Sequence, residues 1–198
     1  MQILQIIASA QGANSYSTQL SQGIIDKLLA AHPGSEVVVR NLAANPLPYL
    51  EEAHLQAYFT PAEGRSPEQQ AAVRHSDEAI AQVQAADVLV IGVPFYNFTV
   101  PASLKSWLDH LTRAGLTFRY TPSGPEGLIK GKKVYVALAS GGIYSEGPMQ
   151  AYDFAVPYLR TILSFLGLTD VTVARAEGVK LPDFQAQAVQ KGIDSVAV

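Results

Sequence analysis

The chain has 198 residues, 48% of them hydrophobic, and this length and composition favour one folded domain with a sizeable core. The formal net charge is −3, no long basic run occurs and no segment has the length of a membrane span, so neither nucleic acid nor a membrane is an expected partner. There is no cysteine, which excludes disulfides, thiolate metal sites and thiol catalysis and is compatible with the cytoplasm, the expected location.

The first predicted element is a short apolar strand from Ile3 to Ala8, which lacks the basic flank of a secretion signal. A small, hydroxyl-rich loop follows at residues 9–17. The next helix ends at His32-Pro33-Gly34. Its apolar face is predicted to contain Leu20, Ile24, Ile25, Leu28 and Leu29.

A second strand is predicted from Val37 to Arg40, followed by a long connection at residues 41–65 that contains prolines and has no clear period. Connections of this length are usually functional lids or partner surfaces. Ser66-Pro67-Glu68-Gln69 is a capping box with proline at the first helical position, and it predicts a helix that runs to about Ala85.

The central strand is predicted at Val88 to Val93, an apolar and β-branched run that is too short for a core helix. The strand stops at Pro94, which cannot donate to a sheet ladder, and the aromatic loop Phe95-Tyr96-Asn97-Phe98 follows. Pro101 suits the first turn of the next helix. The buried stripe of that helix is predicted to be Leu104, Trp107, Leu108 and Leu111.

Residues 112–131 are predicted to be irregular, with a turn at Pro122-Ser123-Gly124-Pro125. A fourth strand, Lys133 to Ala139, runs into the glycine loop Ser140-Gly141-Gly142-Ile143-Tyr144. The remaining predicted elements are a helix at Pro157 to Leu166, a fifth strand at Val171 to Ala174 and a closing helix at Asp183 to Val196.

Five strands that alternate with helices predict an α/β fold with a parallel, doubly wound sheet and right-handed crossovers. The loops after strands one, three and four then share the carboxyl edge of that sheet, where ligands bind in open α/β folds. Rings crowded into such a loop favour a planar ligand.

The loop at residues 9–17 leads into a helix, and a helix N-terminus attracts anions through its free N–H groups and its dipole. Ser9, Ser15 and Ser17 add hydroxyl donors. Neither a Walker A motif nor a G-x-G-x-x-G fingerprint occurs in the chain, so a bound monophosphate is favoured over a nucleotide that is hydrolysed. Serines also cap helices, and on this loop alone a phosphate site and a cap are equally supported.

The Phe95 to Phe98 loop is expected to flank a flat ring system, with Asn97 and backbone amides at its polar edge; a hydrophobic plug is the alternative. Gly141-Gly142 allows close approach of the backbone, whose N–H groups could stabilise a negatively charged ring, although an ordinary turn is favoured for this pair alone. The four histidines are scattered without metal-ligand spacing and are expected to be surface or helix residues: His32, His54, His75 and His110.

The sequence resembles the FMN-dependent NADH-azoreductases, which are flavodoxin-like NADH:quinone oxidoreductases. The similarity covers nearly the whole chain, and the Y-N-F block followed by P-A-x-L-K-x-W-x-D is its most specific part. The segments that carry it are Ser9…Ser15-Tyr16-Ser17, Pro94-Phe95-Tyr96-Asn97-Phe98 with VPASLKSWLDHLTRAGLTFRY, SGGIYSEGP from Ser140, and FLGLTDV with AEG near the end. The resemblance implies a single flavodoxin-like domain over residues 1–198, with a five-stranded sheet in the order 2-1-3-4-5 and helices on both faces.

The resemblance further implies a homodimer with one FMN per subunit near the dimer interface. Carried over by position, the phosphate would be held by Ser9, Ser15, Tyr16 and Ser17, the isoalloxazine lined by Pro94, Phe95, Tyr96, Asn97 and Phe98, and its pyrimidine side approached by Ala139, Ser140, Gly141 and Gly142. The chain departs from the family pattern at Phe95, where many relatives have methionine, at Ala139-Ser140, and at Tyr144, where histidine is frequent. These departures bear on nicotinamide and acceptor preference more than on FMN binding.

The implied activity is ping-pong hydride transfer from NADH or NADPH through FMN to quinones or aromatic azo compounds. No acid–base residue is required; Tyr144 and Tyr120 are the candidates for polarising the flavin or the acceptor. Phe59 and Phe118 are candidates for walls of the acceptor pocket, although ordinary core packing is the favoured interpretation for each. A non-catalytic FMN-binding electron carrier or regulatory module is the alternative function, although uncharged site loops argue against a carrier. A phosphate-binding hydrolase lacks a nucleophile–base pair.

Overall fold

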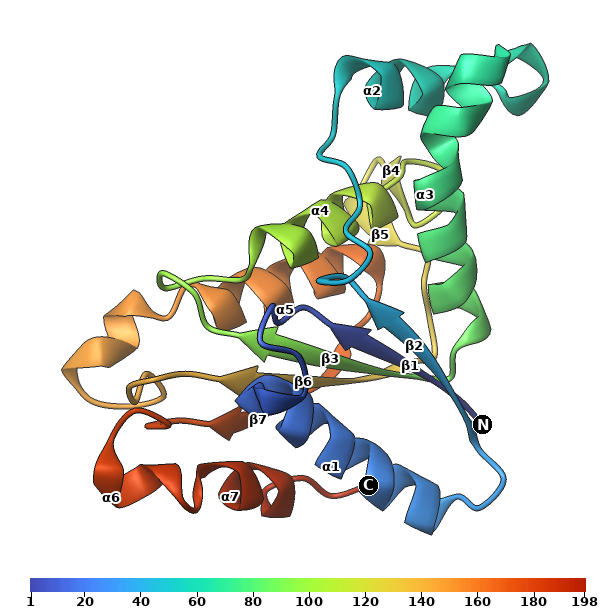
Figure 1. Cartoon of the computed structure of the whole chain (residues 1–198). Coiled ribbons are helices and arrows are strands. Elements are labelled where there is room, and N and C mark those ends of the chain that lie inside the picture. The colour runs from blue at the N-terminus through green and yellow to red at the C-terminus, as the bar shows by residue number, and fades with distance from the viewer.

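Five parallel strands form the central sheet of the computed structural model, which describes residues 1–198 apart from the side chain of Ala13. The strands are β1 (Gln2–Ile7), β2 (Glu36–Asn41), β3 (Val88–Pro94), β6 (Lys133–Ala139) and β7 (Asp170–Ala176). Their order is β2-β1-β3-β6-β7, with every neighbouring pair parallel (Figure 1). This arrangement confirms the predicted order 2-1-3-4-5. The strand β3 lies at its centre and is buried along its whole length, as its apolar sequence predicts.

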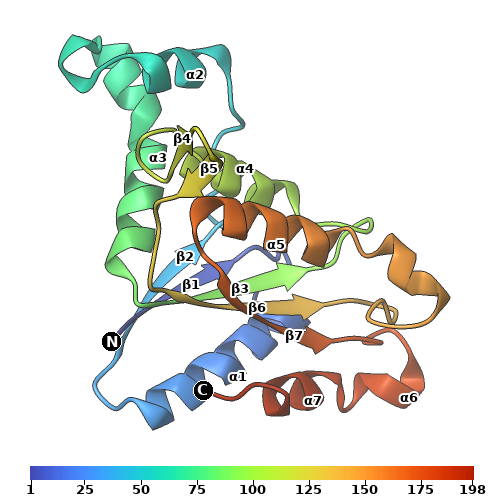
Figure 2. The same cartoon turned by 180° about the vertical axis from the view of Figure 1, so that it is seen from behind.

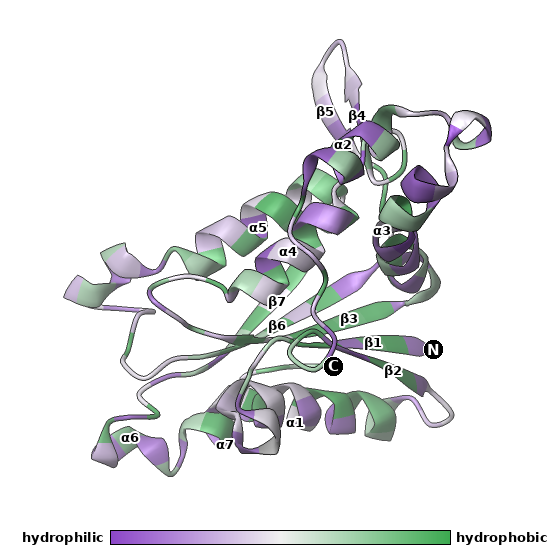
Figure 3. Ribbon diagram, turned by 45° about the horizontal axis from the view of Figure 1, so that its top comes forward, coloured by the Kyte–Doolittle hydropathy of each residue, from purple (hydrophilic) through white to green (hydrophobic). Residues whose placement is uncertain are grey.

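Helices cover both faces of the sheet (Figures 1 and 2). One face carries α1 (Tyr16–Ala31) and α7 (Ala188–Asp194), and the other carries α3 (Pro67–Ala85), α4 (Ala102–Leu111) and α5 (Ala155–Leu166). Apolar side chains form one core cluster on each side of the sheet, and the strands between them are largely hydrophobic in Figure 3. Trp107 and Leu104 are fully buried in the predicted stripe of α4. None of the described helices has the length and apolar character needed to cross a membrane.

The predicted start of α3 is confirmed in detail. The Ser66 hydroxyl accepts a hydrogen bond from the amide of Gln69, while the Gln69 side chain accepts one from the amide of Ser66, and Pro67 occupies the first helical position. A residue with a left-handed backbone ends α5: Gly167 has φ 96° and satisfies the last carbonyls of that helix. Local sequence therefore determines the start of α3 and the end of α5.

Three segments differ from the predictions. The long connection contains a helix, α2 (Glu52–Phe59), and a short 3-10 turn at Ala62–Gly64, where no period was visible. Residues 112–131 contain a hairpin of β4 (Phe118–Thr121) and β5 (Gly124–Gly127), not an irregular stretch. The predicted closing helix is divided into α6 (Pro182–Gln185) and α7. A four-residue strand that contains Pro125 has too little pattern to be recognised.

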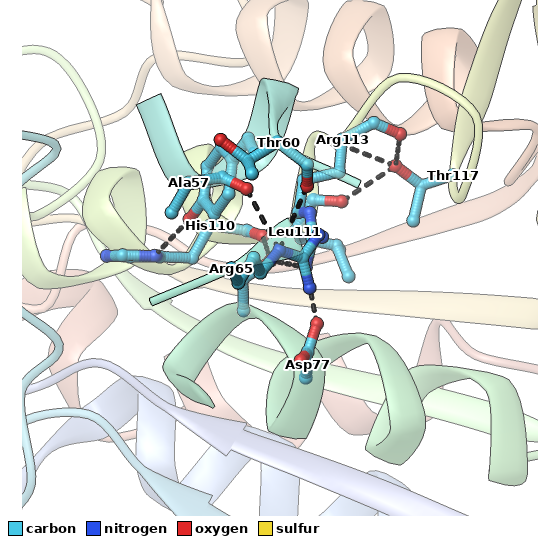
Figure 4. Close-up of polar contacts among 10 residues, drawn as sticks. Ala57, Thr60, Arg65, Asp77, His110, Leu111, Arg113 and Thr117 are labelled. Carbon is cyan, nitrogen blue, oxygen red and sulfur yellow. Dashed lines mark hydrogen bonds and ion pairs between the residues drawn. The ribbon is translucent and has the colours of Figure 1, made fainter. Parts of the chain in front are cut away.

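A polar network joins α2 to α3 and α4. The ring nitrogen Nε2 of His110 lies 2.9 Å from the carbonyl of Pro48, and Nδ1 lies 2.7 Å from the hydroxyl of Tyr58. Since a carbonyl only accepts, Nε2 carries the proton and Nδ1 accepts from Tyr58. The guanidinium of Arg113 stacks over the Tyr58 ring and pairs with Asp77 (Figure 4). Tertiary contacts thus hold residues 48–65, which we call the α2 arm, against α3 and α4.

His54, His75 and His110 lie in helices α2, α3 and α4, as expected, but the fold also brings the three rings together, which the sequence did not indicate. The ring centroids of His54 and His75 lie 5.1 Å and 6.2 Å from that of His110 in edge-on arrangements. We call these three residues the histidine cluster. Among the described residues no group of histidine, cysteine, aspartate and glutamate side chains is arranged to hold a metal ion. The contacts between the three rings join α2, α3 and α4.

Candidate functional site

A cavity of about 260 Å³ lies at the carboxyl edge of the sheet, the edge toward which the arrowheads of β3, β6 and β7 point in Figure 1. It is lined by Ser9, Gln11, Ser15, Tyr16, Ser17, Pro94, Phe95, Tyr96, Ala139, Gly141, Val179 and Lys180. The three loops singled out in the sequence therefore converge on one site. Asn97, Phe98, Ser140 and Gly142 belong to the same loops but do not line this cavity.

One end of the cavity is formed by hydroxyl groups at the start of α1. The hydroxyls of Ser15 and Ser17 lie 3.0 Å apart, and Ser15 caps the helix by accepting from the amide of Thr18 at 3.3 Å. Ser9 shares a 3.4 Å hydrogen bond with the Tyr96 hydroxyl, which connects this loop to the aromatic loop. Serine hydroxyls at a helix N-terminus, where the dipole is positive, suit an anion. Both predicted roles of the serines, capping and anion binding, are compatible here.

A glycine in β3 allows α1 to begin so close to the sheet. A Cβ atom at Gly92 would lie 3.2 Å from the carbonyl oxygen of Ser17 and 3.4 Å from that of Ile6, which is tighter than side chains normally tolerate. Gly92 therefore brings the first turn of α1, with Ser17, against the central strand. The serine end of the cavity depends on this close packing.

The aromatic loop is a tight hairpin turn with an unusual backbone. Tyr96 and Thr99 exchange two 3.1 Å backbone hydrogen bonds around Asn97 and Phe98. Asn97 has φ 49° and Phe98 has φ 71°, the positive values that a type I′ turn requires at both central positions. Asparagine adopts this conformation readily, but for a phenylalanine it is strained. The strain at Phe98 is the kind of backbone outlier found at ligand sites.

The aromatic loop separates two cavities. Phe95 is held to β6 by a 2.8 Å hydrogen bond from its amide to the carbonyl of Ala139, and it lines the first cavity. Tyr96 lines both the first cavity and a second one of about 470 Å³, and Asn97 lines only the second. The second cavity is mostly apolar and runs to the start of α4. A planar ligand that extends past Tyr96 would therefore also meet the Asn97 amide.

A fourth loop, not singled out in the sequence, completes the first cavity. Residues 140–142 are paired with residues 178–180 by three backbone hydrogen bonds of 3.1 to 3.2 Å. This pairing brings Val179 and Lys180 against Gly141, where a Cβ atom would lie 3.1 Å from the Lys180 side chain. Lys180 is the one charged residue among those that line the cavity. The AEG segment and its position after the fifth strand were the available signals for this loop.

The candidate Tyr144 lies beside the cavity, not in it. Its ring packs against Phe95 with centroids 4.4 Å apart, and it covers Gly142, where a Cβ atom would lie 3.3 Å from the tyrosine ring. Its amide donates a 2.9 Å hydrogen bond to the carboxylate of Glu177. Tyr144 therefore supports the aromatic wall formed by Phe95.

Three other candidates lie on the α2 arm and the hairpin, and none of them lines the cavity. Phe59 is 82% exposed at the end of α2, and Tyr120 is 75% exposed in β4. Phe118 is buried against Phe165, with ring centroids 4.5 Å apart, which is the core packing favoured for it. These residues therefore do not contribute to the cavity in this chain.

A larger cavity of about 480 Å³ lies along β7, α6 and α7. Its walls carry charged residues of both signs, among them Arg175, Glu177 and Lys191. It lacks the serine hydroxyls and the ring wall of the smaller cavity. Chemistry, rather than volume, identifies the smaller cavity as the candidate site.

The residues that line the smaller cavity include no aspartate, glutamate, histidine or cysteine. Its hydroxyls, helix N-terminus and single lysine suit an anionic group, and Phe95 and Tyr96 suit a flat ring. This combination fits a molecule that carries a phosphate at one end and an aromatic system at the other.

Comparisons with known proteins identify the family of the chain. The flavodoxin-like fold family matches residues 1–197. An FMN-dependent NADH:quinone oxidoreductase of Aromatoleum aromaticum is 56% identical over 181 residues, which cover 91% of this chain and 89% of that protein. The chain belongs to the FMN-dependent NADH:quinone oxidoreductase family. It is therefore an enzyme of flavodoxin-like fold.

Solved structures of this oxidoreductase family are closely similar. The azoreductase from Bacillus anthracis str. Sterne superposes with a TM-score of 0.90 at 34% identity and covers 98% of this chain and 95% of its own. The FMN-dependent NADH-azoreductase from Bacillus anthracis str. Ames Ancestor in complex with FMN has a TM-score of 0.87 at 26% identity and covers 98% and 94%. The predicted resemblance is confirmed over the full domain.

Proposed function

We propose that each subunit binds one FMN in the cavity lined by Ser15, Ser17, Phe95 and Gly141, and uses it to reduce quinones and aromatic azo compounds at the expense of NADH or NADPH. The convergence of a serine-rich helix N-terminus and an aromatic wall on one cavity carries this proposal. The names of the relatives, which include FMN, NADH and quinone, support it.

The cavity residues fit the parts of FMN. The hydroxyls of Ser15 and Ser17 lie close enough together to donate to one phosphate, at the positive end of the α1 dipole. Phe95 and Tyr96 offer ring faces for the isoalloxazine, and Gly141 lets the backbone approach its polar edge. Lys180 supplies a positive charge in a cavity that has no acidic lining residue.

FMN, when bound, would supply the chemistry for hydride transfer from the nicotinamide donor to the acceptor, in the ping-pong sequence that the resemblance implies. The protein would hold the ring between the aromatic loop and the glycine loop and keep water from it. A quinone takes up the hydride and one proton from solvent to give the hydroquinone. An azo bond needs two such rounds, with a hydrazo compound between them.

We further propose that the chain is a homodimer in which the α2 arm and the β4–β5 hairpin meet a second copy. Both elements project at the same end of the molecule in Figures 1 to 3. The two elements and the residues just before them expose large apolar side chains, which include Tyr49, Leu55, Phe59, Leu116 and Tyr120. Exposed apolar residues in this number are typical of protein interfaces. A partner subunit would be the source of any contribution that Phe59 and Tyr120 make to an acceptor pocket.

The test is a spectroscopic titration without oxygen. The purified protein is supplied with FMN, and its visible spectrum is recorded before and after NADH and then benzoquinone are added. We expect the bound flavin to bleach with NADH and to recover its colour with benzoquinone. A protein that binds no FMN would contradict the cofactor assignment, and a bound flavin that NADH does not bleach would contradict the assigned donor. Sedimentation of the wild type and of Phe59→Ser tests the dimer separately.

A further inference from the structure

The carboxyl edge of the sheet contains a chain of charged groups that the proposed reaction does not use. Arg175 donates to Asp153 at 2.5 Å and to Glu177 at 3.1 Å. The three side chains are 20%, 6% and 12% exposed, so the pairs are shielded from water. Buried ion pairs of this kind contribute less to stability than to holding a specific arrangement.

Glu177 holds the loop that carries Tyr144. One carboxylate oxygen accepts from the amide of Tyr144 at 2.9 Å, and the other accepts from the hydroxyl of Ser145 at 2.5 Å. Glu177 thus spans two consecutive residues of the glycine loop and, through Arg175, connects them to β7. Charge-assisted hydrogen bonds are about twice as strong as neutral ones.

The other end of the network holds the loop before α5. One oxygen of Asp153 accepts from the amides of Ala155 and Val156, both at 3.0 Å, while the other accepts from Arg175. The next residue, Phe154, donates its amide to the carbonyl of Phe98 at 3.1 Å. The network therefore connects the glycine loop, β7 and the start of α5, and through Phe98 it reaches the aromatic loop.

The Tyr144 side chain, whose backbone Glu177 holds, supports the cavity wall. The Tyr144 ring lies against Phe95 at 4.4 Å and edge-on to Phe98 at 6.4 Å. Phe95 lines the cavity and Tyr144 does not. The place of Tyr144 is fixed by its ring, which contacts Phe95 and Phe98, and by its amide, which donates to Glu177.

We propose that Glu177 is a positioning residue of the flavin pocket: its carboxylate holds the Tyr144 backbone so that the Tyr144 ring supports Phe95 against the isoalloxazine. This inference rests on the proposed function, because the pocket is taken to hold FMN. Pre-organised pocket walls raise the affinity because side chains and loops then lose little conformational entropy when the ligand binds. Glu177 is expected to act through Tyr144 alone and to touch neither cofactor nor substrate.

The test is a double-mutant cycle on FMN affinity, measured by fluorescence titration, together with the visible spectrum of the bound flavin. Glu177→Ala is expected to raise the Kd for FMN about tenfold and to shift the spectrum. Tyr144→Ala should raise it similarly, and Glu177→Ala added to Tyr144→Ala should change it less than twofold further. Glu177→Gln, whose amide oxygen can still accept from Tyr144, should stay within about threefold of the wild type.

Two further variants keep the test decisive. Ser145→Ala leaves the Arg175 pairs intact and is expected to raise the Kd about threefold even if Glu177→Ala does not fold. Glu78→Ala, which breaks an exposed ion pair with Arg74 on α3, is the matched control and should leave the Kd unchanged.

Three results would overturn the assignment. A wild-type Kd in both Glu177→Ala and Ser145→Ala would show that Glu177 positions nothing in the pocket. A full tenfold loss from Glu177→Ala in the Tyr144→Ala background would show that it acts by another route, and an equal loss in Glu177→Gln would assign the effect to charge. A wild type that holds no FMN would instead end the proposed function, and this inference with it.

Discussion

The hydroxyls of Ser15 and Ser17 lie 3.0 Å apart at the first turn of α1, but only Ser15 also caps the helix. Substitution of each serine in turn therefore distinguishes an effect on stability from an effect on ligand binding. Ser15→Ala removes the cap and is expected to lower the stability by about 1 kcal/mol. Ser17 bonds only to Ser15 among the interactions described for its side chain, so its loss should affect the fold little.

Ser17→Ala is therefore the cleaner probe of the phosphate site. We expect the Kd for FMN to rise about fivefold to tenfold, since a hydrogen bond to a charged group is lost. Riboflavin, which lacks the phosphate, should bind the variant and the wild type equally. Both affinities are measured by quenching of flavin fluorescence. An equal loss for riboflavin would mean that Ser17 does not face the phosphate.

Two substitutions distinguish the role of the Asn97 side-chain amide from that of its backbone conformation. Asn97→Ala places a side chain that disfavours positive φ at φ 49°, so it should lower the stability by about 1 kcal/mol and weaken FMN retention. Asn97→Gly tolerates that backbone while it also lacks the amide. We expect the glycine variant to keep the wild-type melting temperature within about 2 °C and still to lose FMN affinity.

The two Asn97 variants are compared by thermal melting and by FMN titration on the same preparations. If Asn97→Gly binds FMN as the wild type does, the amide has no role in the site and Asn97 serves the turn alone. If both variants melt early, the amide stabilises the loop itself.

Lys180 is the one charged residue that lines the cavity, and it has no ion-pair partner in the described part of the chain. Lys180→Met keeps the aliphatic stem that packs on Gly141 and removes the charge. We expect FMN to bind about fivefold more weakly to this variant at low salt. The wild-type affinity should fall with added salt more steeply than that of Lys180→Met.

Lys180→Arg is the matched control, because it keeps the charge and should bind FMN within about twofold of the wild type. The affinities are measured by titration at two salt concentrations. Identical salt dependence in the wild type and Lys180→Met would contradict an electrostatic contact between Lys180 and the flavin.

The parts of the fold that could be predicted are those with a strong local signal. The buried run of β3 and the capping box of α3 determine those elements by themselves, and both are where the sequence placed them. The helix α2 has no such signal: it has eight residues, and its place depends on His110 and Arg113, which are about fifty residues away in the chain. The hairpin likewise depends on Phe165 of α5, against which Phe118 packs.

The same distinction applies to the site. Serines before a helix and rings after a buried strand are recognisable because each lies at a predicted strand end. Lys180 was not predicted because its place depends on the pairing of residues 140–142 with residues 178–180, which no periodic pattern indicates. Glu177 was not predicted because its partners, Tyr144 and Ser145, are distant in the sequence. The histidine cluster was missed for a similar reason, since its members lie on three different segments.

Two members of the histidine cluster, His110 and His75, are expected to make stability depend on pH. Burial lowers the pKa of His110 below its ordinary value of 6.5, and it lowers the pKa of His75 in the same direction. Near pH 6.5 and below, the unfolded chain therefore binds more protons than the folded one, so the free energy of unfolding rises with pH there. The stabilisation is complete above about pH 6.5 and is lost as the pH falls through the folded pKa values. One such proton changes the stability by at most about 1.4 kcal/mol per pH unit.

His110→Gln should remove the share of this dependence that His110 carries. We expect its melting temperature to be below that of the wild type at pH 7.5, because the bonds to Pro48 and Tyr58 are weakened, and to fall less between pH 7 and pH 5. His32→Gln, an exposed histidine outside the cluster, is the control and should follow the wild-type curve. Thermal melts at intervals of half a pH unit measure both slopes. A wild-type melting temperature that does not change over this range would show that protonation of the cluster is not linked to unfolding, and equal slopes in His110→Gln and the wild type would assign the linkage to other groups.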